Sequence, residues 1–338
     1  MKKFLTIVLA AVMMLSLIAC GKVNVPETVE VNTENSAYPL SVIDQYGRTV
    51  LIESKPERIV SPYYITSSML IGLGLADKIV GIEDNPEKRN IYGLSADYLL
   101  NLPTVGSLKN FDLEAVASLN PDLVILPMKL KDMSANLDEL GITNIIVNPE
   151  SEELLADMIS IVGEVTDTAD RANELNGYIK SHTDDLVKKN ESVETPTVYL
   201  SGNSDFLLTA GEAMYQSSMI RIAGGKNVAS DIEDTYWAEV DYEQILAWNP
   251  EYIIIASAAG YSVEDVLNDA NLSMCDAVKN KNVYKIPDAI EAWDSPVPGA
   301  FLASIWLESI LHPENVSEDE YNQIVKEFYD KFYNVTIE

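Results

Sequence analysis

The sequence is poor in the side chains that usually bind metals or form disulfides. Its 338 residues include two cysteines, Cys20 and Cys275, and two histidines, His182 and His312. Neither histidine falls at the end of a predicted strand, so neither is placed to serve as a ligand. A zinc or manganese site built from several ligands is therefore not expected, nor is haem held by an axial histidine. A tyrosinate ligand would still allow haem.

Positive charge is also scarce. There are 23 lysines and arginines against 53 aspartates and glutamates, which gives a formal net charge of −30. The composition therefore argues against a basic patch that binds nucleic acid, and we expect no nucleic-acid partner. The acidity is spread over the chain and is best explained by solubility and by repulsion from other anionic surfaces.

Catalytic motifs are missing as well. The chain contains no G-x-S-x-G elbow, no P-loop and no G-x-G-x-x-G after a predicted strand. The pair Gly224-Gly225 follows a predicted helix and so indicates a turn rather than a phosphate-binding loop. We therefore expect neither enzymatic activity nor a resident cofactor.

Only one segment has the length and hydropathy of a membrane-directed sequence. Lys2 and Lys3 precede an apolar run over residues 4–19, which is typical of an export signal. The run ends in Leu-Ile-Ala before Cys20, which resembles a lipoprotein processing site. That resemblance implies removal of residues 1–19, lipidation of Cys20, and attachment to the extracytoplasmic face of the cell membrane. Residues 20–37 are polar and indicate a flexible tether.

Processing at Cys20 would leave Cys275 as the only free thiol of the chain. No internal disulfide is then possible. We expect Cys275 to be buried and inert.

The most informative feature is an internal repeat. Residues 111–126, FDLEAVASLNPDLVIL, recur in altered form as residues 240–255, VDYEQILAWNPEYIII, at an offset of 129 residues. Two copies so far apart indicate two similar lobes, because a solenoid needs three or more closely spaced repeats.

Each copy predicts a short helix, a tight turn and a buried strand. Asp112 can cap the helix, and Glu114 then lies in the first turn, where the helix dipole favours negative charge. Asn120 can adopt the left-handed conformation that ends a helix, and Pro121 cannot continue it. The apolar run over residues 123–126 is typical of a strand buried on both faces of a parallel sheet.

Between the two copies lies a long helical region. Residues 151–190 contain no proline and only two glycines, with apolar residues at helical spacing. A break near Thr166 is the alternative to one continuous helix. We predict an α/β protein of two similar Rossmann-like lobes, residues 38–150 and 191–338, bridged by a single long helix, with a ligand cleft between the lobes.

The order of several short motifs resembles a known family. The motifs are Ile-Val-Ser-Pro at residues 59–62, Leu-Gly-Leu at 73–75, Thr-Val-Gly at 104–106, Asn-Pro-Asp-Leu-Val-Ile at 120–125, Gly-Gly-Lys-Asn at 224–227 and Asn-Pro at 249–250. Together they resemble the substrate-binding lipoproteins of ABC importers that carry iron–siderophores, haem and cobalamin. The resemblance covers nearly the whole mature chain.

This resemblance implies capture of a ligand rather than catalysis. The protein would act as a lipid-anchored monomer and deliver a metal-bearing small molecule to a membrane permease driven by an ATPase. In this family one glutamate in each lobe meets the permease, and the matching positions are Glu114 and Glu243. The residues alone favour the simpler explanation that both glutamates are favourable first-turn charges, and only the resemblance favours docking.

Ligands of open α/β sheets bind beyond the carboxyl ends of the strands. Aromatic side chains offer large contact areas there, and lysines could meet an anionic ligand. The predicted ligand-binding residues are Tyr63, Tyr64, Lys109, Lys129, Tyr236, Trp237 and Trp293.

The leading prediction is a ferric siderophore or a related iron complex. A corrinoid such as cobalamin, haem, and a molybdate-like oxyanion stay open as alternatives. An oxyanion site would need an arginine, and the sequence does not place Arg89 or Arg221. A surface scaffold or adhesin is a remote alternative.

Overall fold

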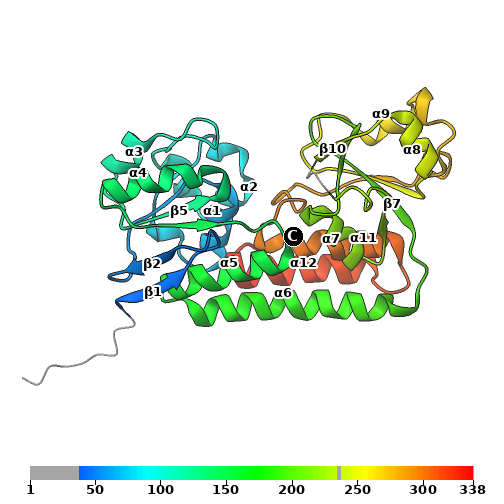
Figure 1. Cartoon of the computed structure of the whole chain (residues 1–338). Helices are drawn as coiled ribbons and strands as arrows, with labels where there is room; N and C mark the ends of the chain where they lie inside the picture. The colour runs from blue at the N-terminus through cyan, green and yellow to red at the C-terminus, as the bar shows by residue number, and fades with distance from the viewer. Residues whose placement is uncertain (1–37, 234–236, 338) are drawn as a thin grey trace, which may run out of the picture. The chain divides into compact units, whose positions relative to one another are not determined.

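The computed structural model describes residues 38–233 and 237–337, which fall within one compact unit. Figure 1 shows two α/β lobes, and the long helix α6 runs beneath both. We use first lobe for residues 38–150 and second lobe for residues 191–337. The fold class predicted from the sequence, two similar α/β lobes, is confirmed.

The first lobe is built on a four-stranded parallel sheet in the order β4-β3-β5-β6. Every residue of β5 and β6 is buried, as the continuous apolar runs of a parallel sheet require. The elements are the hairpin β1 (Leu40–Ile43) and β2 (Thr49–Ile52), β3 (Ile59–Ser61), α1 (Tyr64–Gly72), β4 (Ile79–Ile82), α2 (Asn90–Ser95), α3 (Leu113–Ser118), β5 (Leu123–Pro127), α4 (Ser134–Glu139) and β6 (Asn144–Val147).

The second lobe contains a mixed six-stranded sheet in the order β10-β8-β7-β11-β12, with β9 also paired to β7. Strands β7, β9, β11 and β12 pair in parallel, whereas β8 pairs antiparallel with both of its neighbours, β7 and β10. The elements are β7 (Thr197–Ser201), β8 (Leu208–Ala210), α7 (Tyr215–Ile222), β9 (Lys226–Asn227), β10 (Trp237–Glu239), α8 (Tyr242–Trp248), β11 (Tyr252–Ile255), α9 (Val263–Leu267), α10 (Asp276–Lys279), β12 (Val283–Lys285), α11 (Phe301–Leu311) and α12 (Glu318–Tyr333).

The repeat folds as predicted, α3 leading to β5 and α8 leading to β11. The carboxylate of Asp112 accepts a hydrogen bond from the backbone N–H of Ala115 at 2.9 Å, and that of Asp241 accepts one from Gln244 at 2.8 Å. Asn120 and Asn249 take the left-handed conformation, with φ of 46° and 45°. The equivalent residues therefore start and end the equivalent helices.

The helical region 151–190 is two helices, so the alternative of a break near Thr166 is confirmed and the prediction of one continuous helix is wrong. Helix α5 (Glu152–Val165) ends at Thr166, and Asp167 turns the chain with φ of 57°. Helix α6 (Ala169–Lys189) then returns along α5. The two helices are joined by a hydrogen bond from the Asn176 amide to the Ala156 carbonyl at 2.9 Å. The turn is stabilised by the Thr166 hydroxyl, which donates to the Val162 carbonyl at 2.7 Å.

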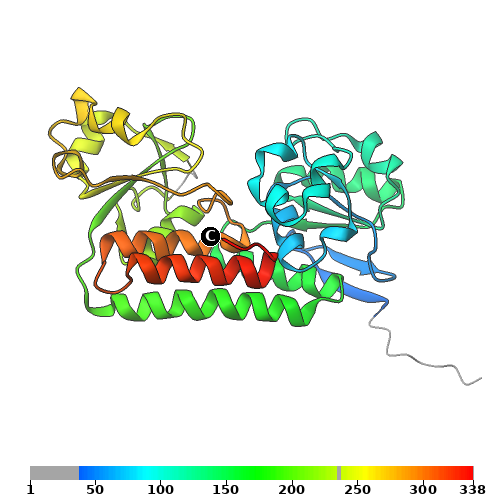
Figure 2. The same ribbon diagram turned by 180° about the vertical axis from the view of Figure 1, so that it is seen from behind.

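Helix α6 carries the chain from the first lobe to the second, and α12 runs beside it in the opposite direction (Figure 2). Near the start of α6, the Arg171 guanidinium donates to the carbonyl of Gly72 in α1 at 3.2 Å and to that of Lys331 in α12 at 2.7 Å. At the far end of α6, Lys189 lies 3.5 Å from the carboxylate of Glu320 near the start of α12. Two helices therefore cross between the lobes where the sequence predicted one.

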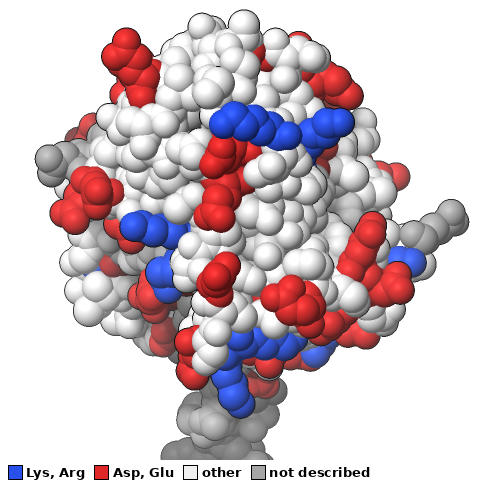
Figure 3. Space-filling view, turned by 90° about the vertical axis from the view of Figure 1, so that its right-hand side faces the viewer, with Lys and Arg blue, Asp and Glu red and all other residues white. Residues whose placement is uncertain are grey.

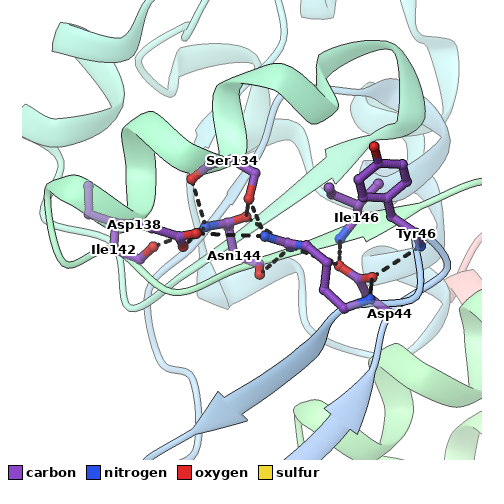
Figure 4. A network of polar contacts seen from close by, with 8 residues as sticks. Asp44, Tyr46, Ser134, Asp138, Ile142, Asn144 and Ile146 are labelled. Atoms are coloured by element: carbon purple, nitrogen blue, oxygen red, sulfur yellow. Dashed lines mark hydrogen bonds and ion pairs between the residues drawn. The ribbon is translucent and has the colours of Figure 1, made fainter.

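A buried polar network joins the β1–β2 hairpin to the first sheet (Figure 4). Asp44 is 3% exposed, and its carboxylate lies 2.7 Å from the guanidinium of Arg48. The same carboxylate accepts a hydrogen bond from the backbone N–H of Ile146 in β6 at 3.0 Å. Arg48 also donates to the Asn144 carbonyl at 3.0 Å. The hairpin is thereby fixed to the edge of the parallel sheet.

Charged side chains are mixed on the face of the second lobe drawn in Figure 3. Carboxylates are spread over much of this face, and the basic side chains visible there lie close to acidic ones. On this face the excess negative charge is therefore dispersed rather than gathered into one patch.

Candidate functional site

A cavity of about 160 Å³ lies between the lobes. Helices α1 and α2 and the turn before α2 form its wall in the first lobe, and the loop between β12 and α11 forms most of its wall in the second. The lining residues are Tyr64, Ser68, Lys88, Arg89, Asn90, Ile91, Tyr92, Ser257, Ala258, Asp288, Ile290, Glu291, Ala292 and Val297. Tyr64 and Ser257 closely follow the carboxyl ends of β3 and β11, where ligands of open α/β sheets bind.

Hydrogen bonds cross this cleft directly. The Tyr64 hydroxyl donates to the hydroxyl of Ser295 at 2.6 Å. The Asn90 amide donates to the Ala289 carbonyl at 3.1 Å. These contacts hold the first residues of α1 and α2 against the loop between β12 and α11 of the second lobe.

Arg89 supplies positive charge to the cavity. Its guanidinium carbon lies 3.9 Å from the centre of the Tyr64 ring, within the range of a cation–π contact. Its nearest carboxylate partner, Glu83, is 4.0 Å from Nε, beyond hydrogen-bonding distance. Among the described residues, the buried Nε atom has no hydrogen-bond partner. A donor of Arg89 is thus left for a ligand.

Glu83 is occupied by other donors. The Tyr92 hydroxyl donates to it at 2.7 Å and the Ser67 hydroxyl at 3.0 Å. Burial raises the pKa of Glu83, while these hydrogen bonds and Arg89 oppose the rise.

A second buried carboxylate, Glu291, lies on the opposite wall. It accepts hydrogen bonds from Ser68 of α1 and from the Tyr329 hydroxyl of α12, the latter at 2.9 Å. Burial raises its pKa to about 7, against the effect of both hydrogen bonds. Glu291 therefore links the first lobe, the loop of the second lobe and the crossing helix.

Asp294 fixes the loop between β12 and α11 to Ser257, which follows β11. Its carboxylate accepts hydrogen bonds from the hydroxyl of Ser257 at 2.5 Å and from the backbone N–H of Ser257 at 3.0 Å. Burial raises the pKa of Asp294 as well. Sequence reasoning did not place Arg89, Glu291 or Asp294 in the site. The available signal was the pair of acids that flanks Trp293 within a mainly apolar segment.

The profile of the periplasmic binding protein family matches residues 59–290. The chain belongs to this family. Its relatives include MolA of Haemophilus influenzae, a molybdate-binding protein, which is 25% identical over 87% of this chain and 91% of its own. YvrC of Bacillus subtilis, an uncharacterized ABC transporter substrate-binding lipoprotein, is 28% identical over 84% of this chain and 89% of its own.

Solved structures have the same fold. A periplasmic solute binding protein from Veillonella parvula superposes with a TM-score of 0.75 at 26% identity, covering 88% of this chain and 94% of its own. The structure of MolA bound to molybdate has a TM-score of 0.78 at 24% identity, covering 88% of this chain and 99% of its own. This periplasmic binding protein is therefore the extracytoplasmic substrate-binding component of an ABC transporter and not an enzyme.

Two predicted residues lie beside a smaller hollow of the binding protein. Tyr63 and Lys129 line a space of about 20 Å³ at the carboxyl ends of β3 and β5. The Tyr63 and Tyr64 rings meet edge to face, 5.4 Å apart, so this hollow lies next to the main cavity. Burial raises the pKa of Glu150 in the same hollow, and Lys129 opposes that rise. Lys109 is exposed and lines neither space.

The structure places Trp293 in the core, which corrects the sequence-based placement at the ligand surface. Its side chain is 3% exposed, and the indole N–H donates to the Tyr329 hydroxyl at 2.7 Å. The loop that carries Trp293 reaches the cleft, but its anchoring to α12 turns this side chain inward.

Trp237 lies in β10, paired with Ala210 of β8, and packs against the main core without lining either space. Tyr236, also predicted to bind ligand, and Cys20, the predicted lipidation site, lie outside the described residues.

The two glutamates predicted to meet a permease occupy equivalent positions. Glu114 and Glu243 both lie in the first turn of their helices, and both side chains are exposed. Helices α3 and α8 lie at the top of the two lobes in Figure 1, on the side away from α6.

The described residues contain neither a membrane-spanning helix nor a metal-binding cluster. No helix within residues 38–233 and 237–337 is both long and apolar enough to cross a membrane. The same residues contain no group of three or more histidine, cysteine, aspartate or glutamate side chains placed to hold a metal ion.

Proposed function

We propose that the protein captures a compact anionic metal species, of the molybdate type, in the cavity between its lobes and delivers it to the permease and ATPase of an ABC importer. The observation that carries this proposal is Arg89, which faces the cavity with a buried donor that no described residue satisfies. Charged donors of this kind bind oxyanions by strong hydrogen bonds.

The size of the cavity supports a small ligand. At about 160 Å³ it falls below the roughly 300–1,000 Å³ typical of sites for organic molecules. Lys88 and the second amide hydrogen of Asn90 can add donors around an anion that Arg89 holds. The relationship to MolA, whose name states that it binds molybdate, agrees with this ligand class.

The test is a binding titration of the purified protein with molybdate, tungstate, sulfate, ferric siderophores, haemin and cobalamin. We expect molybdate or tungstate to bind, and Arg89→Gln to weaken that binding at least about tenfold, because a hydrogen bond to a charged group contributes ~1.5–3 kcal/mol. Lys109→Gln is the control, since Lys109 is exposed and lines no part of the cavity. Equal binding by the wild type and Arg89→Gln would refute the role of Arg89.

A ferric siderophore is the second candidate. The edge-to-face pair of Tyr63 and Tyr64 favours it, because flat aromatic walls suit such complexes, and Lys129 stands beside Tyr63. Selective binding of a ferric siderophore, with loss of affinity in Tyr63→Ala, would replace the oxyanion proposal.

For delivery, we propose that Glu114 and Glu243 contact the permease. Both are exposed on equivalent helices, and two separate ion pairs would set the orientation of docking. Replacing both with alanine should reduce uptake while leaving ligand binding intact. Replacement of the exposed Glu139 and Glu264 is the matched control. Normal uptake by the first pair of replacements would remove this assignment.

Lipid anchoring at Cys20 is part of the same proposal, with residues 20–37 as the tether and the monomer as the working unit. Cys20→Ser should release the protein from the membrane fraction and abolish incorporation of labelled fatty acid. Retention of both properties would contradict anchoring at this residue.

A further inference from the structure

A second cavity lies away from the ligand cleft, among helices α5, α6, α7 and α11. Its volume is about 410 Å³, within the roughly 300–1,000 Å³ typical of small-molecule sites. In Figure 1, α5 and α7 both lie above α6. Helix α5 packs against the first lobe and α7 belongs to the second, so this groove lies between a helix that supports one lobe and a helix of the other.

One side of the groove is apolar. Its floor is formed by aliphatic and aromatic side chains of four helices: Leu155, Ile159, Ile179, Ile222 and Phe301. A ligand with a branched aliphatic body would bury surface here.

Two acceptors in the groove lack partners. The Oε1 atom of Glu152 and the Oδ1 atom of Asn176 are buried, and neither accepts a hydrogen bond from any described residue. Unsatisfied buried polar atoms are rare in native proteins and suggest that something else supplies the partner. A group with several N–H donors would satisfy both atoms.

Arg221 provides the opposite charge at the same groove. Its guanidinium donates to the Ser218 hydroxyl at 3.2 Å, and no ion pair within 4.0 Å joins it to a carboxylate among the described residues. The positive charge of Arg221 nevertheless opposes the rise in the pKa of Glu152 that burial causes. The two charges are therefore near each other but not in direct contact. A ligand that carries an ammonium and a carboxylate on one carbon could bridge the space between Glu152 and Arg221.

We propose that this groove binds an α-amino acid with a branched aliphatic side chain. Its ammonium group would donate to Glu152 and Asn176, its carboxylate would accept from Arg221, and its side chain would pack on Leu155 and Ile179. The proposal is independent of the anion in the cleft. An occupant here contacts α5, which packs against the first lobe, together with α7 of the second lobe.

The test is a calorimetric titration of the purified protein with L-leucine. We expect binding in the wild type, at least a tenfold loss of affinity in Glu152→Gln, and no change in Glu164→Gln, an exposed control on the same helix. Matched probes that lack one charge, 4-methylpentanoate and 3-methylbutylamine, should each bind at least tenfold more weakly. A lack of leucine binding, or equal binding by Glu152→Gln, would overturn the proposal.

The pH dependence offers a second readout. Burial raises the pKa of Glu152 to about 7, and an ammonium ligand requires the ionised carboxylate. Affinity should therefore be about tenfold higher at pH 8 than at pH 6. The other charged and titratable groups that line the groove are Glu153, Lys180, Asp184, Tyr215 and Arg221. Affinity that stays constant between these pH values would contradict an ammonium contact with Glu152.

Molybdate binding separates this proposal from the cleft proposal. Glu152→Gln should leave molybdate affinity unchanged, and Arg89→Gln should leave leucine affinity unchanged. A loss of both affinities in Glu152→Gln, with its fold intact by circular dichroism, would mean that Glu152 acts through the structure and not through a separate site.

Discussion

Gly163 and Gly177 are the only glycines in the helical region 151–190, yet their surroundings differ. A Cβ atom on Gly163 would lie 2.4 Å from the Cβ of Ala172, whereas one on Gly177 would meet nothing within 4 Å. Glycine at position 163 therefore permits the close packing of α5 on α6, and glycine at position 177 has no such role.

We expect Gly163→Ala to destabilise the protein and Gly177→Ala to stabilise it. Overpacking costs ~1–3 kcal/mol and should exceed the gain of ~1 kcal/mol in helix propensity at position 163. At position 177 only the gain of about 0.4–1 kcal/mol remains. Urea denaturation of the two variants measures both changes. A more stable Gly163→Ala variant would contradict the observed helix packing.

Glu291 makes the stability of the protein depend on pH. Its folded-state pKa, about 7, lies above the ordinary value of 4.5 because the carboxyl group is buried. The folded state therefore binds more protons than the unfolded state between these values, and stability should fall as pH rises from about 4.5 to 7. The loss amounts to on the order of 3 kcal/mol.

The measurement is the free energy of unfolding of the wild type and Glu291→Gln at pH 5 and pH 8. The difference between the two proteins should shift in favour of Glu291→Gln at pH 8. Glu243→Gln, at an exposed position, is the control and should follow the wild type. A pH-independent difference between wild type and Glu291→Gln would contradict the raised pKa.

Among the elements, the β1–β2 hairpin contains a buried carboxylate, Asp44, paired with Arg48. Its strands pair only with each other, so its attachment to the first sheet relies on Asp44 and Arg48, on the hydrogen bonds of Gln45 to Ile146 and Asn148, and on apolar packing. The Asp44 carboxylate also accepts the backbone N–H groups of Tyr46 and Arg48, which close the hairpin turn. Loss of this carboxylate leaves three backbone donors and a guanidinium without their acceptor.

Asp44→Ala should therefore cost on the order of 3 kcal/mol, the usual effect of removing one partner from a buried pair. Asp184→Ala is the comparison, because Asp184 forms an exposed pair with Lys180 within α6 and should contribute ~0.3–0.5 kcal/mol. Thermal unfolding of both variants provides the measurement. Similar losses in the two variants would show that the Figure 4 network does not stabilise the fold beyond a surface pair.

At the scale of the molecule, the two lobes share one hydrophobic core. A single buried cluster contains Ile59 and Leu123 of the first sheet, Val162 of α5, and Val198 and Phe328 of the second lobe. Helices α6 and α12 both cross between the lobes and contribute side chains to this cluster. Neither lobe can therefore unfold without exposing apolar surface of the other.

We expect the protein to unfold in one transition. All four tryptophans, Trp237, Trp248, Trp293 and Trp306, lie in the second lobe, so tryptophan fluorescence reports on that lobe alone, whereas far-ultraviolet circular dichroism reports on both. The two signals should give the same denaturant midpoint. Separate midpoints would show that the lobes unfold independently and that the shared core does not couple them.

Residues whose role depends on their neighbours in the sequence could be predicted. Residues that the fold brings together from distant parts of the chain could not. Asp112, Glu114, Asn120 and their equivalents act within a few residues of themselves, so the repeat was sufficient to place them. Arg89 faces the cavity only because the turn before α2 meets a loop of the second lobe about 200 residues later. Trp293 was misplaced because its inward orientation depends on Tyr329 of the distant helix α12.

The sequence by itself determined the α/β class, the two related lobes, the helix caps and the family, because these follow from local spacing, capping and motif order. Only the tertiary structure decided the break at Thr166, the second crossing by α12 and the composition of the cleft. The break depends on Gly163 meeting Ala172, and the cleft depends on side chains from separate lobes meeting across it. Such contacts depend on how distant elements pack, which local sequence patterns do not specify.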